Sequence, residues 1–234
     1  ANTFVFKAES MERDRQLMTT ETFRVHYEGK QGKHIGSVFG YQRGSMVFSK
    51  ATHPEFFGEG VESYNTLAVP AGYEIRVAAD TGTFTSLLII AFSPEGDAFV
   101  LQEFPNYHYV SGTPELDPDM TIPGWTSKVV SHIYALGGRP YGKADHNSQF
   151  KEELGNYGVL QEGNTTPLEA RTKIAQEYFQ HYHVWFAPWL SVLPYELEIA
   201  KWPEEATAAG KYARIKDRDH TLDCLEHVLS QRPR

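Results

Sequence analysis

The feature of this sequence that most constrains its fold is a continuous run of apolar residues from Leu87 to Phe92. A strand with one solvated face would carry a polar side chain at every second position, and this run has none. The run is also far shorter than the roughly 20 residues that a membrane-spanning helix needs. We therefore expect a central β-strand that is covered on both faces, and no membrane partner.

Short strand candidates, separated by Gly, Pro and Asp turns, fill the chain from Thr22 to about Leu136. This spacing is typical of antiparallel β structure. The first candidate alternates apolar and polar residues, which predicts one buried face. The candidates are Thr22–Glu28, His34–Tyr41, Ser45–Ser49, Tyr64–Val69, Glu74–Ala79, Ser86–Phe92, Ala98–Phe104, Tyr107–Val110 and Lys128–Leu136.

Helices are expected after the glycine-rich segment that begins at Gly137. Thr166 is a predicted N-cap, because Pro167 follows it and Glu169 completes a Thr-x-x-Glu capping box. Asp219 similarly precedes a C-terminal helix. The apolar residues spaced for burial on that helix are Leu222, Leu225 and Leu229.

These patterns predict one α+β domain over residues 1–234, with a β-rich part in 1–136 and a loop and helical part in 137–234. The expected form is an antiparallel β-rich sandwich or half-barrel over about residues 22–136, with helices from the C-terminal third packed on it. A chain of 234 residues with 41% hydrophobic residues is long enough to bury a substantial core.

The charge of the chain predicts that it does not bind nucleic acid. The formal net charge is −8, and no cluster of Lys and Arg forms a basic stripe that would neutralise phosphates. We expect instead a small apolar or aromatic molecule as the partner, because aromatic residues make up 13% of the chain.

Cys224 is the single cysteine, so intrachain disulfides and cysteine-based zinc clusters are excluded. This favours a soluble, cytoplasmic protein. Export after removal of a signal peptide is the alternative, because the sequence begins with Ala and contains the glycosylation sequon Asn164-Thr165-Thr166.

The densest cluster of potentially chemical side chains is His181-Tyr182-His183. If the preceding helix reaches His181, then Glu177 and His181 share one face and can bind a metal ion. If a strand begins near Gln180, His181 and His183 project together as a chelating pair. The helical geometry turns His183 away from that metal ion. The predicted roles are acid and base for His181 and His183, or metal ligands for His181, His183 and Glu177.

Three further residues are candidates for the same chemistry. His108 and His132 lie in aromatic or apolar strand candidates, where either can supply a general acid or base that converges on the histidine pair. Glu59 lies in a glycine-containing loop with aromatic neighbours, where a carboxyl group with a raised pKa can also act in acid/base catalysis.

The sequence lacks the Gly-x-Ser-x-Gly, His-Glu-x-x-His and Gly-x-Gly-x-x-Gly motifs of well-known enzyme classes. We therefore expect a lyase or isomerase that uses histidine acid/base chemistry in an aromatic-lined pocket. Two alternatives stay open: a metal-dependent oxygenase with His ligands, and a non-catalytic protein that binds an apolar or aromatic ligand. The expected cofactor is none or a single divalent transition metal.

Overall fold

A computed structural model of the protein describes residues 38–58, 63, 67–117, 122–136, 141–144, 148–163, 165–181, 183–202 and 214–231. Its centre is a six-stranded sheet in the order β7-β6-β1-β2-β3-β8. The strands are β1 (Glu74–Asp80), β2 (Ser86–Phe92), β3 (Ala98–Glu103), β6 (Tyr141–Ala144), β7 (Leu160–Gly163) and β8 (Val184–Phe186).

Strands β1, β2 and β3 form an antiparallel meander at the middle of this sheet. All seven residues of β2 are buried, which confirms the expected central strand covered on both faces. In β1, Val77, Ala78 and Ala79 are also fully buried, and the strand ends at Asp80.

The other strands join the meander in parallel. β6 pairs with β1 and β7 pairs with β6 on one side, while β8 pairs with β3 on the other. Parallel neighbours need long crossover connections, and helices supply them. These helices are α3 (Ile122–Ala135), α4 (Ser148–Asn156) and α5 (Leu168–Gln180).

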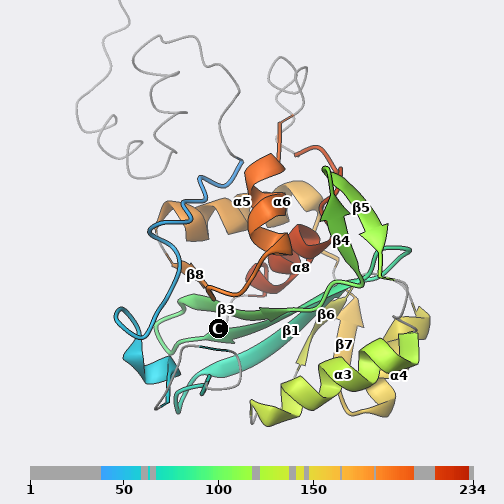
Figure 1. The fold of residues 1–234 in the computed structure, drawn as a ribbon, viewed down its shortest axis with the longest axis horizontal. Coiled ribbons are helices and arrows are strands. Elements are labelled where there is room, and N and C mark those ends of the chain that lie inside the picture. The colour runs from blue at the N-terminus through green and yellow to red at the C-terminus, as the bar shows by residue number, and fades with distance from the viewer. Residues whose placement is uncertain are drawn as a thin grey trace, which may run out of the picture.

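Helices cover both faces of the sheet (Figure 1). On one face lie α3 and α4, and on the other lie α5, α6 (Val192–Ile199) and α8 (His220–Leu229). Helix α8 packs between the strands β1 and β2 and the helices α5 and α6, so every residue from Thr221 to Leu229 is buried. The burial of Leu222, Leu225 and Leu229 confirms the helix that Asp219 was expected to precede.

A separate two-stranded hairpin, β4 (Tyr107–Val110) and β5 (Thr113–Leu116), stands next to α6 and α8 (Figure 1). Its two-residue turn consists of Ser111 and Gly112, with φ values of 50° and 82°. Positive φ at both positions is the backbone twist that two-residue hairpin turns require, which is why glycine is favoured there. A short 3-10 turn, η1 (Pro54–Phe56), precedes the sheet.

The structure confirms the α+β class, with helices from the C-terminal third packed on the sheet. The sheet is mixed: β1, β2 and β3 pair antiparallel, whereas β6, β7 and β8 join in parallel. The strand predicted over Lys128–Leu136 is wrong, because these residues belong to α3 and its C-terminal end. Ser45–Ser49 contributes only an isolated bridge from Val47 to Phe186. The strand candidate Thr22–Glu28 lies outside the described residues, as do parts of His34–Tyr41 and Tyr64–Val69.

None of the helices in the described part of the chain is both long enough and apolar enough to cross a bilayer.

Candidate functional site

Asp80 is held at the carboxyl end of β1 by helix α8. Its Oδ2 lies 2.8 Å from His220 Nδ1, and its backbone N–H donates to Cys224 Sγ at 3.0 Å. The Cys224 thiol in turn donates to the Ser86 carbonyl oxygen. These bonds fasten the first two turns of α8 to the sheet and leave the Asp80 side chain 12% exposed.

Asp223 lies on α8 three residues after His220 and directly before Cys224, and both of these residues contact Asp80. Residues three apart are neighbours on a helix, so Asp223 and His220 share one face of α8. One carboxylate oxygen of Asp223 forms an ion pair with Arg214, and the other lies 2.6 Å from Lys216 Nζ. The negative charge of Asp223 contributes to the raised pKa of Asp80. The two carboxylates therefore form one electrostatic unit, although they lie far apart in the chain.

The pKa values of the two carboxyl groups shift in opposite directions. Burial raises the pKa of Asp80, and Asp223 adds to this rise, while the hydrogen bond from His220 opposes it. Burial alone would raise the pKa of Asp223 as well, but Arg214 and Lys216 outweigh it and hold that pKa below its usual value. Asp223 is therefore a carboxylate at neutral pH. Any further cation near Asp80 would lower the raised pKa of its carboxyl group and stabilise its charged form.

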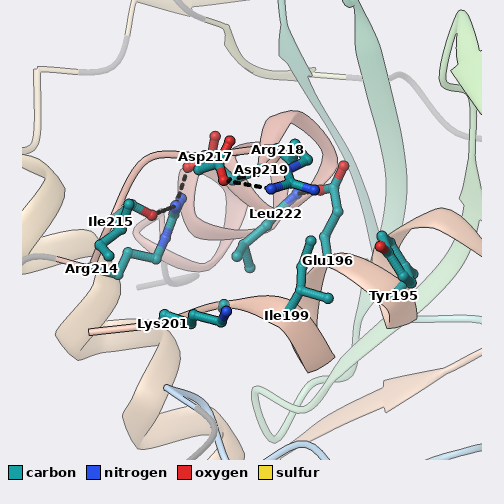
Figure 2. A pocket seen from close by; sticks show the side chains of 11 residues that line it. Tyr195, Glu196, Ile199, Lys201, Arg214, Ile215, Asp217, Arg218, Asp219 and Leu222 are labelled. Carbon is teal, nitrogen blue, oxygen red and sulfur yellow. Dashed lines mark hydrogen bonds and ion pairs between the residues drawn. The ribbon is translucent and has the colours of Figure 1, made fainter. Parts of the chain in front are cut away.

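Arg214 links three carboxylates on and before α8, and Figure 2 shows its ion pair with one of them, Asp219. Its side chain is fully buried and forms ion pairs with Asp219, Asp223 and Glu226, the last with a distance of 3.0 Å from Nε to Oε1. Glu226 also accepts a hydrogen bond from the Thr172 hydroxyl of α5. A guanidinium presents donors in a fixed fork, so Arg214 fixes the orientation of the Asp223 carboxylate.

Glu196 links α6 and the β4–β5 hairpin to the start of α8. Its Oε2 accepts the backbone N–H of Leu222 at 2.7 Å, and its Oε1 accepts the hydroxyls of Tyr107 and Tyr109. Burial raises the pKa of Glu196 to about 8, even though these hydrogen bonds favour the charged form.

A cavity of about 170 Å³ lies between α6 and the segment that leads into α8 (Figure 2). Its lining includes Tyr195, Glu196, Lys201, Arg218 and Asp219, but neither Asp80 nor Asp223. The carboxylate pair is therefore adjacent to this cavity and not inside it.

The histidine pair predicted from the sequence lies at a different end of the sheet. Helix α5 ends at Gln180, so His181 is its C-cap, and β8 begins only at Val184. The rings of His181 and His183 are 6.2 Å apart, and His183 Nδ1 contacts the Asp97 carboxylate. Glu177 contacts His181 through its backbone oxygen, which accepts the His181 N–H.

Among the described residues, His108 and His132 are not brought to this pair. His108 is on β4, where its Nδ1 lies 2.7 Å from Asp117 Oδ1. His132 is on α3, on the opposite face of the sheet from α5, and its ring packs against Phe104. Glu59 lies outside the described residues. Catalytic or metal-binding roles for these residues stay predictions.

The donor atoms at Asp80 and Asp223 suit a hard divalent cation. Carboxylate oxygens are the ligands that Mg²⁺ and Mn²⁺ prefer, and both side chains project from rigid elements. Within the described ranges, no group of three acidic, His or Cys side chains is arranged to hold a metal ion. In the sequence, Asp145 follows Ala144, which ends β6 and pairs with Ala79 of β1.

The fold is similar to that of solved nuclease domains. No protein-family model matches the sequence, and no curated protein matches it.

The particular structures are those of phage large terminases. The large terminase from a thermophilic bacteriophage, in complex with ATP-gamma-S, has a TM-score of 0.64 and 14% identity over 95% of this chain and 52% of that chain. The large terminase nuclease from thermophilic phage G20c has a TM-score of 0.54 and 12% identity over 84% of this chain and 99% of that chain. For the P22 large terminase nuclease domain the TM-score is 0.53 and the identity 10%, over 82% and 90% of the two chains. This chain thus spans about half the length of the first of these proteins.

The similarity to large terminase structures corrects three expectations from the sequence. The function of a lyase or isomerase acting on a small molecule is wrong, as is the small-molecule partner, because the similar structures are nuclease domains. The expectation of no nucleic acid is wrong for the same reason. A net charge of −8 describes the long-range field of the chain, whereas a carboxylate site for a cation is itself acidic.

The sequence patterns did not single out Asp80 or Asp223. Two signals were available: an acidic residue that ends an apolar strand, and an acidic residue among Leu222, Cys224 and Leu225 on an otherwise apolar helix. Neither signal shows that the two residues meet.

Proposed function

We propose that this protein is a divalent-metal-dependent nuclease that hydrolyses phosphodiester bonds in DNA. The observation that carries the proposal is the attachment of α8, which bears Asp223, to Asp80 at the carboxyl end of β1 through His220 and Cys224, within a fold similar to large terminase nuclease domains. In open sheets with parallel strands, ligands bind outside the carboxyl ends of the strands.

Asp80 and Asp223 would bind the cation through carboxylate oxygens. His220 orients the Asp80 carboxylate by its hydrogen bond, and Arg214 orients that of Asp223. When bound, a divalent cation supplies stabilisation of the negative charge that develops on a phosphate during hydrolysis. The surrounding residues keep both carboxylates fixed, because α8 is buried on all sides.

The test is nicking of supercoiled plasmid DNA in the presence of Mg²⁺ or Mn²⁺. Asp80→Asn and Asp223→Asn each keep the shape of the side chain but remove its negative charge. We expect each to lower the rate by a factor on the order of 100, the size of effect seen when one electrostatic contact to a transition state is removed. Asp145→Asn tests whether the chain after β6 contributes a further carboxylate.

Asp117→Asn is the matched control, since Asp117 lies on the hairpin side of the molecule, where it contacts His108 and the Asn106 backbone oxygen. It should nick DNA at the wild-type rate. Nicking that survives in folded Asp80→Asn and Asp223→Asn proteins, or that needs no divalent cation, would overturn the proposal.

A further inference from the structure

Lys216 brings a positively charged side chain to the carboxylates of Asp223 and Asp80. Its Nζ lies 2.6 Å from Asp223 Oδ2, while Arg214 takes the other oxygen of Asp223. The positive charge of Lys216 also lowers the pKa of Asp80. Both oxygens of Asp223 therefore already contact positive charge in the protein itself.

The two cations differ in how firmly they are held. Arg214 is 0% exposed and is shared among three carboxylates, so its removal from Asp223 would leave buried charges without partners. The Lys216 side chain is 53% exposed and forms its ion pair with Asp223. A lysine ammonium is a compact point charge on a flexible stem, so it can leave its position and become hydrated.

We propose that Lys216 competes with the divalent cation for Asp223 and thereby sets the metal affinity of the site. This inference rests on the proposed function, because it takes Asp80 and Asp223 as the metal ligands. When a metal binds, the ammonium must move away from Asp223 Oδ2 into solvent. The cost of this movement, and the repulsion between the two cations, weaken metal binding.

The experiment is titration calorimetry of the full chain with Mn²⁺, with folding of each variant checked by circular dichroism. Lys216→Gln should bind Mn²⁺ roughly tenfold more tightly than the wild type, because a half-exposed charge at contact distance from a ligand is removed. Lys216→Met, which also lacks the charge, should show the same gain.

Two further variants separate charge from position. Lys216→Arg keeps the charge and adds a fork that can hold a carboxylate with two hydrogen bonds, so its Mn²⁺ affinity should equal or fall below that of the wild type. Lys173→Gln removes an exposed lysine on α5, and its affinity should equal that of the wild type.

Unchanged or weaker Mn²⁺ binding in both Lys216→Gln and Lys216→Met would overturn this inference. If the wild type still loses Mn²⁺ binding on Asp80→Asn substitution, the proposed function stands and only the role of Lys216 fails. If neither the wild type nor the Lys216 variants bind Mn²⁺ in a way that depends on Asp80, the proposed function fails as well.

Discussion

At the scale of single residues, the candidate site depends on Arg214, whose positive charge balances three buried carboxylates. Asp219, Asp223 and Glu226 all contact this one guanidinium, and their side chains are at most 10% exposed. Buried carboxylates without a partner cost several kcal/mol each. Arg214 therefore stabilises the fold and the Asp223 ligand at once.

Arg214→Met should lower the free energy of unfolding by about 3–5 kcal/mol, because it leaves buried carboxylates without their partner. Urea unfolding followed by circular dichroism measures the effect. Arg218→Met is the control: Arg218 is exposed and pairs with the exposed Asp217, so its loss should leave stability close to that of the wild type. A loss below about 1 kcal/mol in Arg214→Met would show that the cluster is not a stabilising unit.

At the scale of elements, α8 connects the candidate site to the rest of the molecule. It contacts the sheet through β1 and β2, and the other helices through α5 and α6. Glu196 fixes its first turn, since it accepts the Leu222 N–H that has no partner within the helix. The hydroxyls of Tyr107 and Tyr109 tie the β4–β5 hairpin to the same carboxyl group.

The Glu196 carboxyl group should make stability depend on pH. Its pKa of about 8 lies above the usual value of 4.5, so the folded protein binds this proton more tightly than the unfolded chain does. The stabilisation is complete below about pH 4.5 and is lost as pH rises towards 8, with a slope of at most about 1.4 kcal/mol per pH unit.

Glu196→Gln should remove this dependence. Urea unfolding at pH 5, 6, 7 and 8 gives the difference in unfolding free energy between the variant and the wild type, and this difference should move in favour of the variant as pH rises. A difference that stays constant over this range would contradict the raised pKa. Glu198→Gln, on the same helix, is the control and should leave the pH dependence unchanged.

The antiparallel elements could be predicted from the sequence, because their pairing is local. The predicted Tyr107–Val110 has the same bounds as β4, and the predictions for β1, β2 and β3 differ from the structure by at most one residue. The strand predicted over Lys128–Leu136 failed because of its period: Trp125, Val129 and Ile133 are buried four residues apart, which is a helical spacing.

The site could not be predicted in the same way, because it depends on contacts across the whole chain. Asp219 was recognised only as a helix start, and Asp223 not at all. The role proposed for Asp223 depends on the packing of α8 against β1. No local sequence pattern predicts that these two elements lie next to each other. The histidine cluster attracted attention because imidazole is chemically distinctive, whereas single carboxylates are common in any sequence.

At the scale of the whole molecule, the reactivity of Cys224 can be used to measure whether α8 stays packed against the sheet. Cys224 is 0% exposed, lies on α8 next to Asp223, and burial raises the pKa of its thiol well above the usual value. A thiol reacts as the thiolate and only when reagent can reach it. Its reactivity should therefore follow opening of the α8 contacts.

In native buffer, Cys224 should resist a thiol reagent such as 5,5′-dithiobis(2-nitrobenzoate), and its labelling rate should rise with urea in parallel with global unfolding. Arg214→Met should accelerate labelling, since it destabilises the same helix. Rapid labelling of the folded wild-type protein would show that α8 opens without global unfolding.

The proposed nuclease site requires a cation bound by both Asp80 and Asp223. Anomalous diffraction from crystals of the protein soaked in Mn²⁺ locates such an ion without reference to activity. We predict an anomalous peak in contact with the carboxylates of Asp80 and Asp223, with Lys216 Nζ moved away from Asp223. A peak at His181 and His183, with none between Asp80 and Asp223, would contradict this assignment.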